Sequence, residues 1–298
     1  ARVERTPRRH LPADLVDRYR ETKFDIHTLD GINGWRNRMY DTVMKRLENL
    51  GDEIHDRHLY KLTAPTGAGK TLLSFSVALK WRAQIEQQLD YTPRIIYSLP
   101  FTSVIDQNEQ VLRDVLELLP DFKSHFHNYL LKHHHLSDIR YRRDDREQPL
   151  KDSLILVESW EAEVTITTFI QLFHTVIGNQ NRFLKKFHKI AGSIIILDEV
   201  QNLPIEYWPL IRWTLKALAE TFQCKILLLT ATQPFIFEEG EAVELLEGDN
   251  IEPASFFVEQ SRVELELVKP VGKGYTPDEW TGLFQRTFQP GLNYMAVF

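Results

Sequence analysis

The residues best suited to chemistry begin with a glycine-rich loop at residues 64–71, Ala-Pro-Thr-Gly-Ala-Gly-Lys-Thr. A short apolar run precedes this loop, and residues 72–79 after it have the apolar density of a buried helix. Glycines let successive backbone N–H groups point at one anion, and a helix start adds the positive end of its dipole. The loop therefore indicates a phosphate-binding loop, although Ala64 stands where the strict pattern has its first glycine.

Each part of this loop has an expected role toward ATP. Lys70 supplies a positive charge for the β- and γ-phosphates, and the Thr71 hydroxyl can bind Mg²⁺. The remaining phosphate contacts fall to Thr66, Gly67, Ala68 and Gly69. Apolar residues at helical spacing predict a helix over residues 32–50, from which Arg36 or Asn37 could contact the adenine.

Two further stretches contain residues that could take part in catalysis, and both follow apolar runs. Asp198 and Glu199 come directly after residues 194–197, and a Thr-Ala-Thr sequence at 230–232 follows residues 226–229. In open α/β sheets, ligands bind at the carboxyl ends of the strands. We therefore expect Asp198 to hold Mg²⁺ and Glu199 to polarise the attacking water.

These stretches require a scaffold that brings several strand ends to one edge. Continuous apolar or β-branched runs predict strands at residues 59–62, 94–99, 164–168, 194–197 and 226–229. Helical patterns separate these runs, among them one at residues 203–222. Alternating strands and helices predict an α/β fold, a parallel sheet with helices on both faces.

Another predicted strand end carries side chains suited to a nucleic-acid backbone. After Phe101, the hydroxyls of Thr102 and Ser103 stand at the start of a predicted helix. Hydroxyls and helix starts bind phosphate without reading base sequence. The net charge of −6 argues against a uniformly basic nucleic-acid coat but leaves room for a local basic groove.

Composition indicates an ordinary globular protein. The chain has 298 residues, 43% hydrophobic and 26% charged, enough for one large domain or two ordinary ones. A single cysteine, Cys224, excludes internal disulfides and fits a cytoplasmic location. No apolar run approaches the roughly 20 residues that span a membrane. Because the chain begins at Ala1 and stops in mid-pattern at Phe298, we expect a fragment of a longer protein.

Other polar stretches of the sequence are weaker candidates for nucleic-acid or metal binding. The arginine-rich residues 1–22 favour a linker or surface helix over a nucleic-acid arm. The His55-Asp56 pair lies in a short polar connector, without the further ligands of a metal phosphohydrolase. Three consecutive histidines at 133–135 cannot all face one metal from a helix or strand, and the arginine run at 140–146 favours a solvated loop.

The order of the motifs resembles the first RecA-like lobe of a superfamily 2 helicase. A closer resemblance, over about residues 30–298, is to the CRISPR-associated helicase–nucleases of type I systems. It rests on the loop at 64–71, the Pro-Phe-Thr-Ser stretch within 98–107, the histidines at 134 and 135, and the Asp-Glu-x-Gln-x-Leu-Pro stretch within 197–204.

This resemblance implies an ATP-driven motor that needs ATP and Mg²⁺. The motor would be recruited by the CRISPR RNA-guided surveillance complex to an R-loop and travel 3′ to 5′ on the displaced single-stranded DNA. It would feed that strand to an HD nuclease, an attached domain or a separate subunit. Lys70, Asp198, Glu199 and Gln201 would act in hydrolysis, and Thr230 and Thr232 would couple nucleotide to DNA. Along the DNA strand would lie Phe101, Thr102, Thr167 and Thr168.

The resemblance also implies a domain organisation. Residues 1–30 would form an N-terminal extension, 31–240 the first RecA-like lobe, and 241–298 an inter-lobe linker with the truncated start of a second lobe. The nuclease ligand set and the arginine finger of the second lobe are not in this sequence, so we expect the chain alone to be inactive. The alternatives are a DNA-repair or restriction helicase of the same superfamily, or a nucleotide switch that does not hydrolyse ATP.

Overall fold

The computed structural model describes residues 8–51, 56–89, 91–133, 159–232, 236–247, 253–259 and 276–287. The chain divides into two compact units, residues 1–260 and 261–298. Helix α13, Pro277–Thr287, is the described part of the second unit, and its Trp280 and Phe284 rings lie 6.4 Å apart. All features discussed below belong to the first unit.

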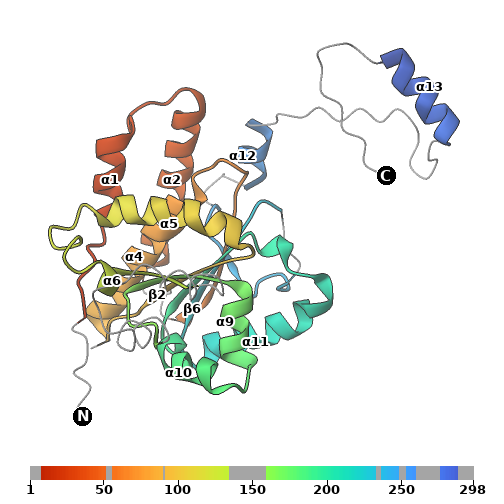
Figure 1. Cartoon of the computed structure of the whole chain (residues 1–298). Coiled ribbons are helices and arrows are strands. Elements are labelled where there is room, and N and C mark those ends of the chain that lie inside the picture. Colours follow the sequence, from red (N-terminus) through yellow and green to blue (C-terminus); the bar gives the residue numbers. More distant parts are fainter. Residues whose placement is uncertain are drawn as a thin grey trace, which may run out of the picture. The chain divides into compact units, whose positions relative to one another are not determined.

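The first unit is built on a parallel sheet (Figure 1). Its strands are β1 (Leu59–Thr63), β2 (Ile95–Leu99), β3 (Leu130–His133), β4 (Val164–Thr168), β5 (Ile194–Asp198), β6 (Lys225–Thr230) and β7 (Val243–Glu244). In the described residues the order is β3-β4-β2-β5-β6-β1-β7, and every pair of neighbours is parallel. The predicted α/β fold with a parallel sheet is therefore confirmed.

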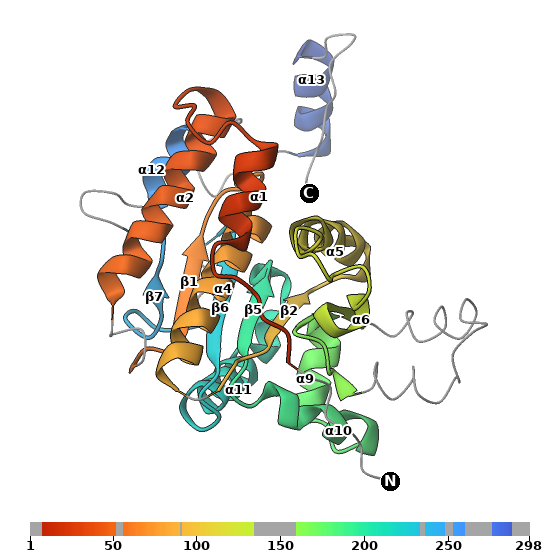
Figure 2. The same cartoon turned by 90° about the vertical axis from the view of Figure 1, so that its left-hand side faces the viewer.

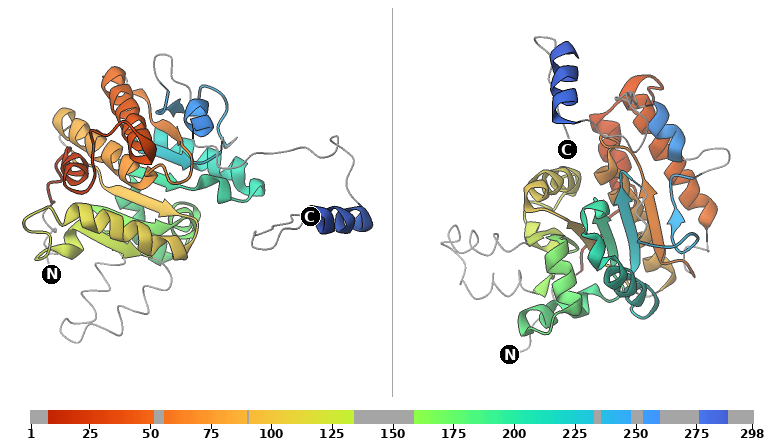
Figure 3. Two further views of the ribbon diagram at one scale, coloured as in Figure 1. Left: turned by 90° about the horizontal axis from the view of Figure 1, so that it is seen from above. Right: turned by 90° about the vertical axis from the view of Figure 1, so that its right-hand side faces the viewer.

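Helices cover both faces of this sheet (Figures 2 and 3). One face packs against α1 (Leu15–Lys23), α2 (Gly31–Leu50), α4 (Lys70–Gln88) and α5 (Thr102–Leu116). The other packs against α9 (Phe169–Ile177), α10 (Asn181–Ile190) and α11 (Trp208–Glu220). Shorter elements are α6 (Phe126–Tyr129), α12 (Pro253–Glu259) and the 3₁₀ turns η1 (Val200–Asn202) and η2 (Ile205–Tyr207).

Strand residues alternate between the two cores. In β2, Ile95, Tyr97 and Leu99 join the core under α4 and α5, whereas Ile96 joins the core under α9 and α11. Strands buried on both faces need apolar residues at every position. This requirement explains the continuous apolar runs that predicted the central strands.

The start of one helix was predicted too early in the sequence. A helix was predicted from Leu203, but α11 begins at Trp208, after the two 3₁₀ turns. Pro204 pushes the residue before it toward extended backbone, and Leu203 has φ −73° and ψ 129°. Pro209 in the first turn of α11 fits the later start, because a helix tolerates proline there.

The N-terminal segment is more deeply packed than a linker or surface helix would be. Leu11, Leu15 and Val16 are buried, and α1 contacts α4 and α5. Nearby, the buried Glu163 carboxylate at the start of β4 accepts hydrogen bonds from the guanidinium groups of Arg8 and Arg82 at 2.6 and 2.8 Å. Burial alone would raise the pKa of Glu163, but these two arginines hold it below its ordinary value.

Several sequence predictions fall outside the described residues. They concern His55 of the His-Asp pair, the histidines at 134 and 135, and the arginine run at 140–146. Within the described ranges, none of the helices combines the length and apolarity that crossing a bilayer requires.

Candidate functional site

The glycine loop connects the end of β1 to the start of α4. Gly67 and Gly69 have φ angles of 80° and 78°, in the left-handed region that favours glycine. A Cβ at Gly69 would meet no atom within 4 Å, so the need for glycine there comes from the backbone angle and not from crowding. The loop is tied to the neighbouring strand, because the Ala64 N–H donates to the Thr230 carbonyl at 3.0 Å.

Lys70 places its ammonium group between this loop and the acidic stretch. Its side chain is 8% exposed, and Nζ donates to the Ala64 carbonyl at 3.3 Å. The same Nζ lies 3.4 Å from Oε1 of Glu199. The structure thus brings the loop lysine and the second acid together, although 129 positions of sequence, 199 minus 70, separate them.

Asp198 ends β5 at the same edge of the sheet and is 5% exposed. Its Oδ2 accepts a hydrogen bond from the Tyr97 hydroxyl at 2.8 Å. Burial raises the pKa of Asp198 to about 6, and the charge of Glu199 acts in the same direction. Its Oδ1 is buried and has no hydrogen-bond partner among the described residues. An orphaned carboxylate oxygen fits a hard divalent cation such as Mg²⁺.

Thr71, the other candidate cation ligand, stands in the first turn of α4. Its hydroxyl donates to Oδ1 of Asn108 at 2.7 Å, and the Asn108 amide in turn donates to the Val104 carbonyl at 3.0 Å. No group of three or more histidine, cysteine, aspartate or glutamate side chains is arranged for a metal ion in the described ranges. A cation here would therefore depend on Asp198, Thr71 and the phosphates of a bound nucleotide.

Glu199 has an unusual backbone for a residue with a side chain. Its φ of 58° and ψ of 44° lie in the left-handed region, which costs about 1–3 kcal/mol for such a residue. The conformation accompanies contacts of its carboxylate with Lys70 and with the side-chain amide of Gln201. Oε1 of Gln201 accepts from the Thr230 hydroxyl at 3.0 Å. The three stretches therefore form one network.

Thr230 and Thr232 lie at the end of the neighbouring strand β6. The Thr230 hydroxyl accepts from the Thr232 N–H at 3.0 Å and lies close to the Thr232 carbonyl as well as to Gln201. A hydroxyl has one proton, so the carbonyl and the Gln201 amide oxygen compete for it. Thr230 is buried, whereas Thr232 is exposed.

The residues expected along a nucleic-acid strand divide into two groups. Phe101 is 54% exposed and Ser103 is exposed, while Thr102 at the first position of α5 is half-buried. Thr167 is buried and donates to the His133 carbonyl at 2.9 Å. The Thr168 hydroxyl caps α9 by accepting from the Gln171 N–H at 3.2 Å. In this conformation the last two hydroxyls serve the strand and the helix.

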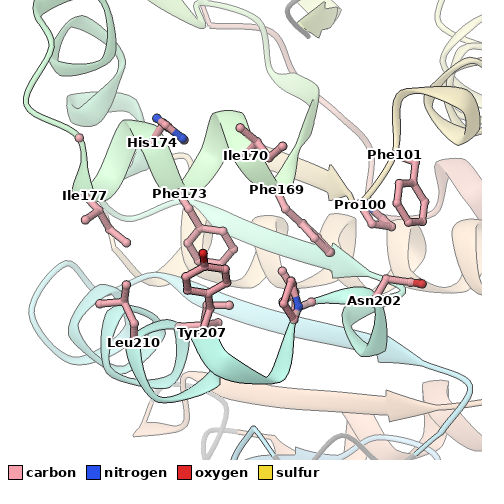
Figure 4. A pocket seen from close by; sticks show the side chains of 14 residues that line it. Pro100, Phe101, Phe169, Ile170, Phe173, His174, Ile177, Asn202, Tyr207 and Leu210 are labelled. Atoms are coloured by element: carbon pink, nitrogen blue, oxygen red, sulfur yellow. The ribbon is translucent and has the colours of Figure 1, made fainter.

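An apolar cavity of about 670 Å³ opens beside Phe101, between α9 and the segment from η1 to α11 (Figure 4). Its walls come from three separate parts of the chain: Pro100, Phe101, Phe169, Ile170, Phe173, His174, Ile177, Gly178, Asn202, Leu203, Pro204, Tyr207, Leu210 and Ile211. Lysine and arginine are absent from this lining, so the cavity is unsuited to phosphate. No local sequence pattern predicted this cavity.

The candidate adenine contacts have different surroundings. Arg36 reaches the glycine loop, where its Nε donates to the Gly67 carbonyl at 2.9 Å. The Asn37 amide donates to the carbonyls of Asp25 and Thr28 and accepts from Arg20. Asn37 therefore holds the α1–α2 connection together. Arg36 lines a small cavity of about 100 Å³ beside the loop.

Comparisons with known proteins agree with these motifs. The family model described as DEAD/DEAH box helicase matches residues 42–239. The curated CRISPR-associated nuclease/helicase Cas3 of Haloferax volcanii is 31% identical, over 75% of this chain and 27% of its own length. The chain thus spans about a quarter of that relative. The resemblance drawn from the motifs is confirmed.

Solved structures agree at the level of the fold. The crystal structure of T. fusca Cas3-AMPPNP has a TM-score of 0.53 at 19% identity, covering 76% of this chain and 23% of that one. The structure of T. fusca Cas3-ATP has a TM-score of 0.53 at 18% identity, covering 75% and 22%. The chain therefore has the fold of one part of these much longer proteins.

Proposed function

Since this chain belongs to the DEAD/DEAH box helicase family, we propose that it supplies the first ATP-binding lobe of a motor that moves along single-stranded DNA in CRISPR type I interference. The network that joins Lys70, Glu199, Gln201 and Thr230 carries this proposal. It links the phosphate loop, the acidic stretch and the Thr-Ala-Thr stretch at one edge of the sheet. Similarity to Cas3 supports the CRISPR assignment.

The residues of the network divide the work of ATP hydrolysis. The backbone of residues 66–69 and the Lys70 ammonium hold the phosphates, because fixed N–H groups and a cation stabilise their negative charge. Asp198 and Thr71 would hold Mg²⁺, which would neutralise phosphate charge. Glu199 orients the attacking water and accepts its proton. Arg36, whose guanidinium donates to the Gly67 carbonyl, would contact the adenine.

Gln201 and Thr230 would transmit the state of the nucleotide to β6. Gln201 touches Glu199 with its amide nitrogen and Thr230 with its amide oxygen, so a shift of Glu199 changes the Thr230 hydrogen bond. The Thr232 carbonyl competes with the Gln201 amide oxygen for the proton of the Thr230 hydroxyl. The alternative partners of the Thr230 hydroxyl give β6 two arrangements that hydrolysis can switch.

The DNA strand would cross the carboxyl edge of the sheet near the starts of α5 and α9. Phe101 can stack on a base, Thr102 and Ser103 can bind a phosphate, and Thr168 with Thr167 behind it supports the start of α9. None of these contacts reads base identity, so binding should tolerate any sequence and weaken with salt.

In the whole protein this lobe would work with a second lobe, an HD nuclease and the CRISPR RNA-guided surveillance complex, all in the cytoplasm. A DNA-repair or restriction helicase of the same superfamily is the second candidate, because it would use the same network. The intact Lys70, Asp198 and Glu199 argue against a switch that binds nucleotide without hydrolysis.

The test is ATP turnover by the natural full-length protein with single-stranded DNA of mixed sequence. Glu199→Gln should lower turnover at least 100-fold and leave ATP binding within about threefold, because it removes the proton acceptor and spares the loop. Glu206→Gln, which changes an exposed acid on η2, is the matched control and should keep wild-type turnover. Turnover by Glu199→Gln near the wild-type rate would contradict the assignment.

A further inference from the structure

Tyr97 is a buried phenol in the middle of the otherwise apolar strand β2. It has no exposed surface, and its hydroxyl donates to Oδ2 of Asp198 at 2.8 Å. Burial, reinforced by the charge of Asp198, raises the pKa of Tyr97 well above 10. The phenol therefore keeps its proton at physiological pH and acts as a hydrogen-bond donor to the carboxylate.

The sheet register explains this contact. Tyr97 pairs with Ile196 of β5, and the side chains of Ile196 and Asp198 lie on the same face because strand residues alternate. That face packs against α4. The Tyr97 phenol thus contacts Asp198, a residue expected to hold a divalent cation, on the face of the sheet that α4 covers.

The contact leaves the two oxygens of Asp198 unequal. Oδ2 is held by Tyr97, whereas Oδ1 is buried and has no partner among the described residues. A carboxylate anchored at one oxygen loses its freedom to rotate about its last bond. The other oxygen then keeps a single direction, which hard cations with strict geometry require.

We propose that Tyr97 is a positioning residue for the divalent cation: its hydroxyl holds Asp198 so that Oδ1 meets the cation or its bound water. This inference rests on the proposed nucleotide site. It adds a residue outside the motifs, one whose loss should change how much the cation strengthens nucleotide binding. A phenol that served only the packing of β2 would affect binding equally with and without the cation.

The experiment compares Tyr97→Phe with the wild type in the full-length protein. Calorimetry measures the affinity for ADP with Mg²⁺ in excess over ADP, and again in a metal chelator. Mg²⁺ should strengthen ADP binding by the wild type, and this gain should fall about 10-fold in Tyr97→Phe, because a hydrogen bond to a charged group is lost. The affinity in chelator should stay within about twofold.

Tyr60→Phe is the matched control. Tyr60 is also a buried tyrosine of the same sheet, in β1, which β5 and β6 separate from β2, and its hydroxyl donates to the Arg57 carbonyl at 3.1 Å. This variant should keep the wild-type gain from Mg²⁺. Near-ultraviolet circular dichroism checks that each variant is folded, and the gain is a ratio within one protein, so a partly unfolded sample does not change it.

Two results would overturn the inference. One is a Tyr97→Phe variant with the wild-type gain from Mg²⁺, and the other is an equal loss of affinity with and without Mg²⁺. Either result would leave the proposed nucleotide site standing, because the wild type would still bind ADP. A wild type that binds no ADP under either condition would overturn both the nucleotide site and the role of Tyr97.

Discussion

Replacing Asp198 by asparagine should stabilise the nucleotide-free protein at neutral pH. Asp198 is 5% exposed, and burial raises its pKa from 3.8 to about 6. A shift of about two pKa units, at 1.36 kcal/mol each, corresponds to about 3 kcal/mol. This is the free energy that burying the charge costs the folded state once the group is fully ionised.

The sign follows from the direction of the shift. Because the folded-state pKa lies above the unfolded value, the folded protein binds the proton more tightly and is favoured at low pH. The penalty is absent below pH 3.8, grows as the pH rises, and is complete above about pH 6. Asp198→Asn removes the charge at every pH and keeps an oxygen that can accept from Tyr97.

The assay is urea unfolding of the nucleotide-free protein in chelator. Asp198→Asn should exceed the wild type in stability by about 1–3 kcal/mol at pH 7.5, and the difference should shrink to about 1 kcal/mol or less at pH 4.5. Asp14→Asn, which changes an exposed aspartate paired with Arg18, should change stability by less than about 0.5 kcal/mol. A wild type more stable than Asp198→Asn at pH 7.5 would refute the reasoning.

Three further stability predictions use thermal or urea unfolding. Glu244 is a buried carboxylate that accepts from the Thr63 N–H at 3.1 Å, and burial raises its pKa. The free energy of unfolding of Glu244→Gln should therefore match or exceed that of the wild type at pH 7.5, and a loss above about 1 kcal/mol would contradict this. Arg82→Met should cost about 3–5 kcal/mol, because Glu163 stays buried with one fewer cation, and a cost below about 1 kcal/mol would count against it. Thr168→Ala should cost about 1 kcal/mol through loss of the α9 cap, and an unchanged midpoint would show that the cap contributes nothing.

The central strands could be predicted because their signal is local. A run such as residues 194–197 is apolar at every position, which suits a strand covered on both faces. Strands β3 and β7 lie at the two edges of the sheet and have four and two residues, too few for a pattern to stand out. Helix α10 was not predicted, although Phe183, Leu184, Phe187 and Ile190 recur in it at helical spacing.

The motif residues could be named from sequence because their order and context are distinctive. Their supporting residues could not. Tyr97 lies within an apolar run and resembles a core residue, and its partner Asp198 is 101 positions away. Asn37 is the opposite case, a residue predicted to bind ligand that serves the fold. Its polar side chain suggested an adenine contact, but its amide donates its hydrogen bonds to carbonyls of the α1–α2 connection.

The central claim is that the loop at residues 64–71 binds the phosphates of a nucleotide, and calorimetry with ADP and ATP tests it most directly. Lys70→Ala should weaken binding about 10- to 100-fold, because it removes a charge-assisted contact of about 1.5–3 kcal/mol. Lys80→Ala is the control, since Lys80 lies on the same helix but pairs with Asp17, 2.9 Å away. It should bind within about twofold of the wild type. Equal nucleotide affinity in the wild type and Lys70→Ala would contradict the claim.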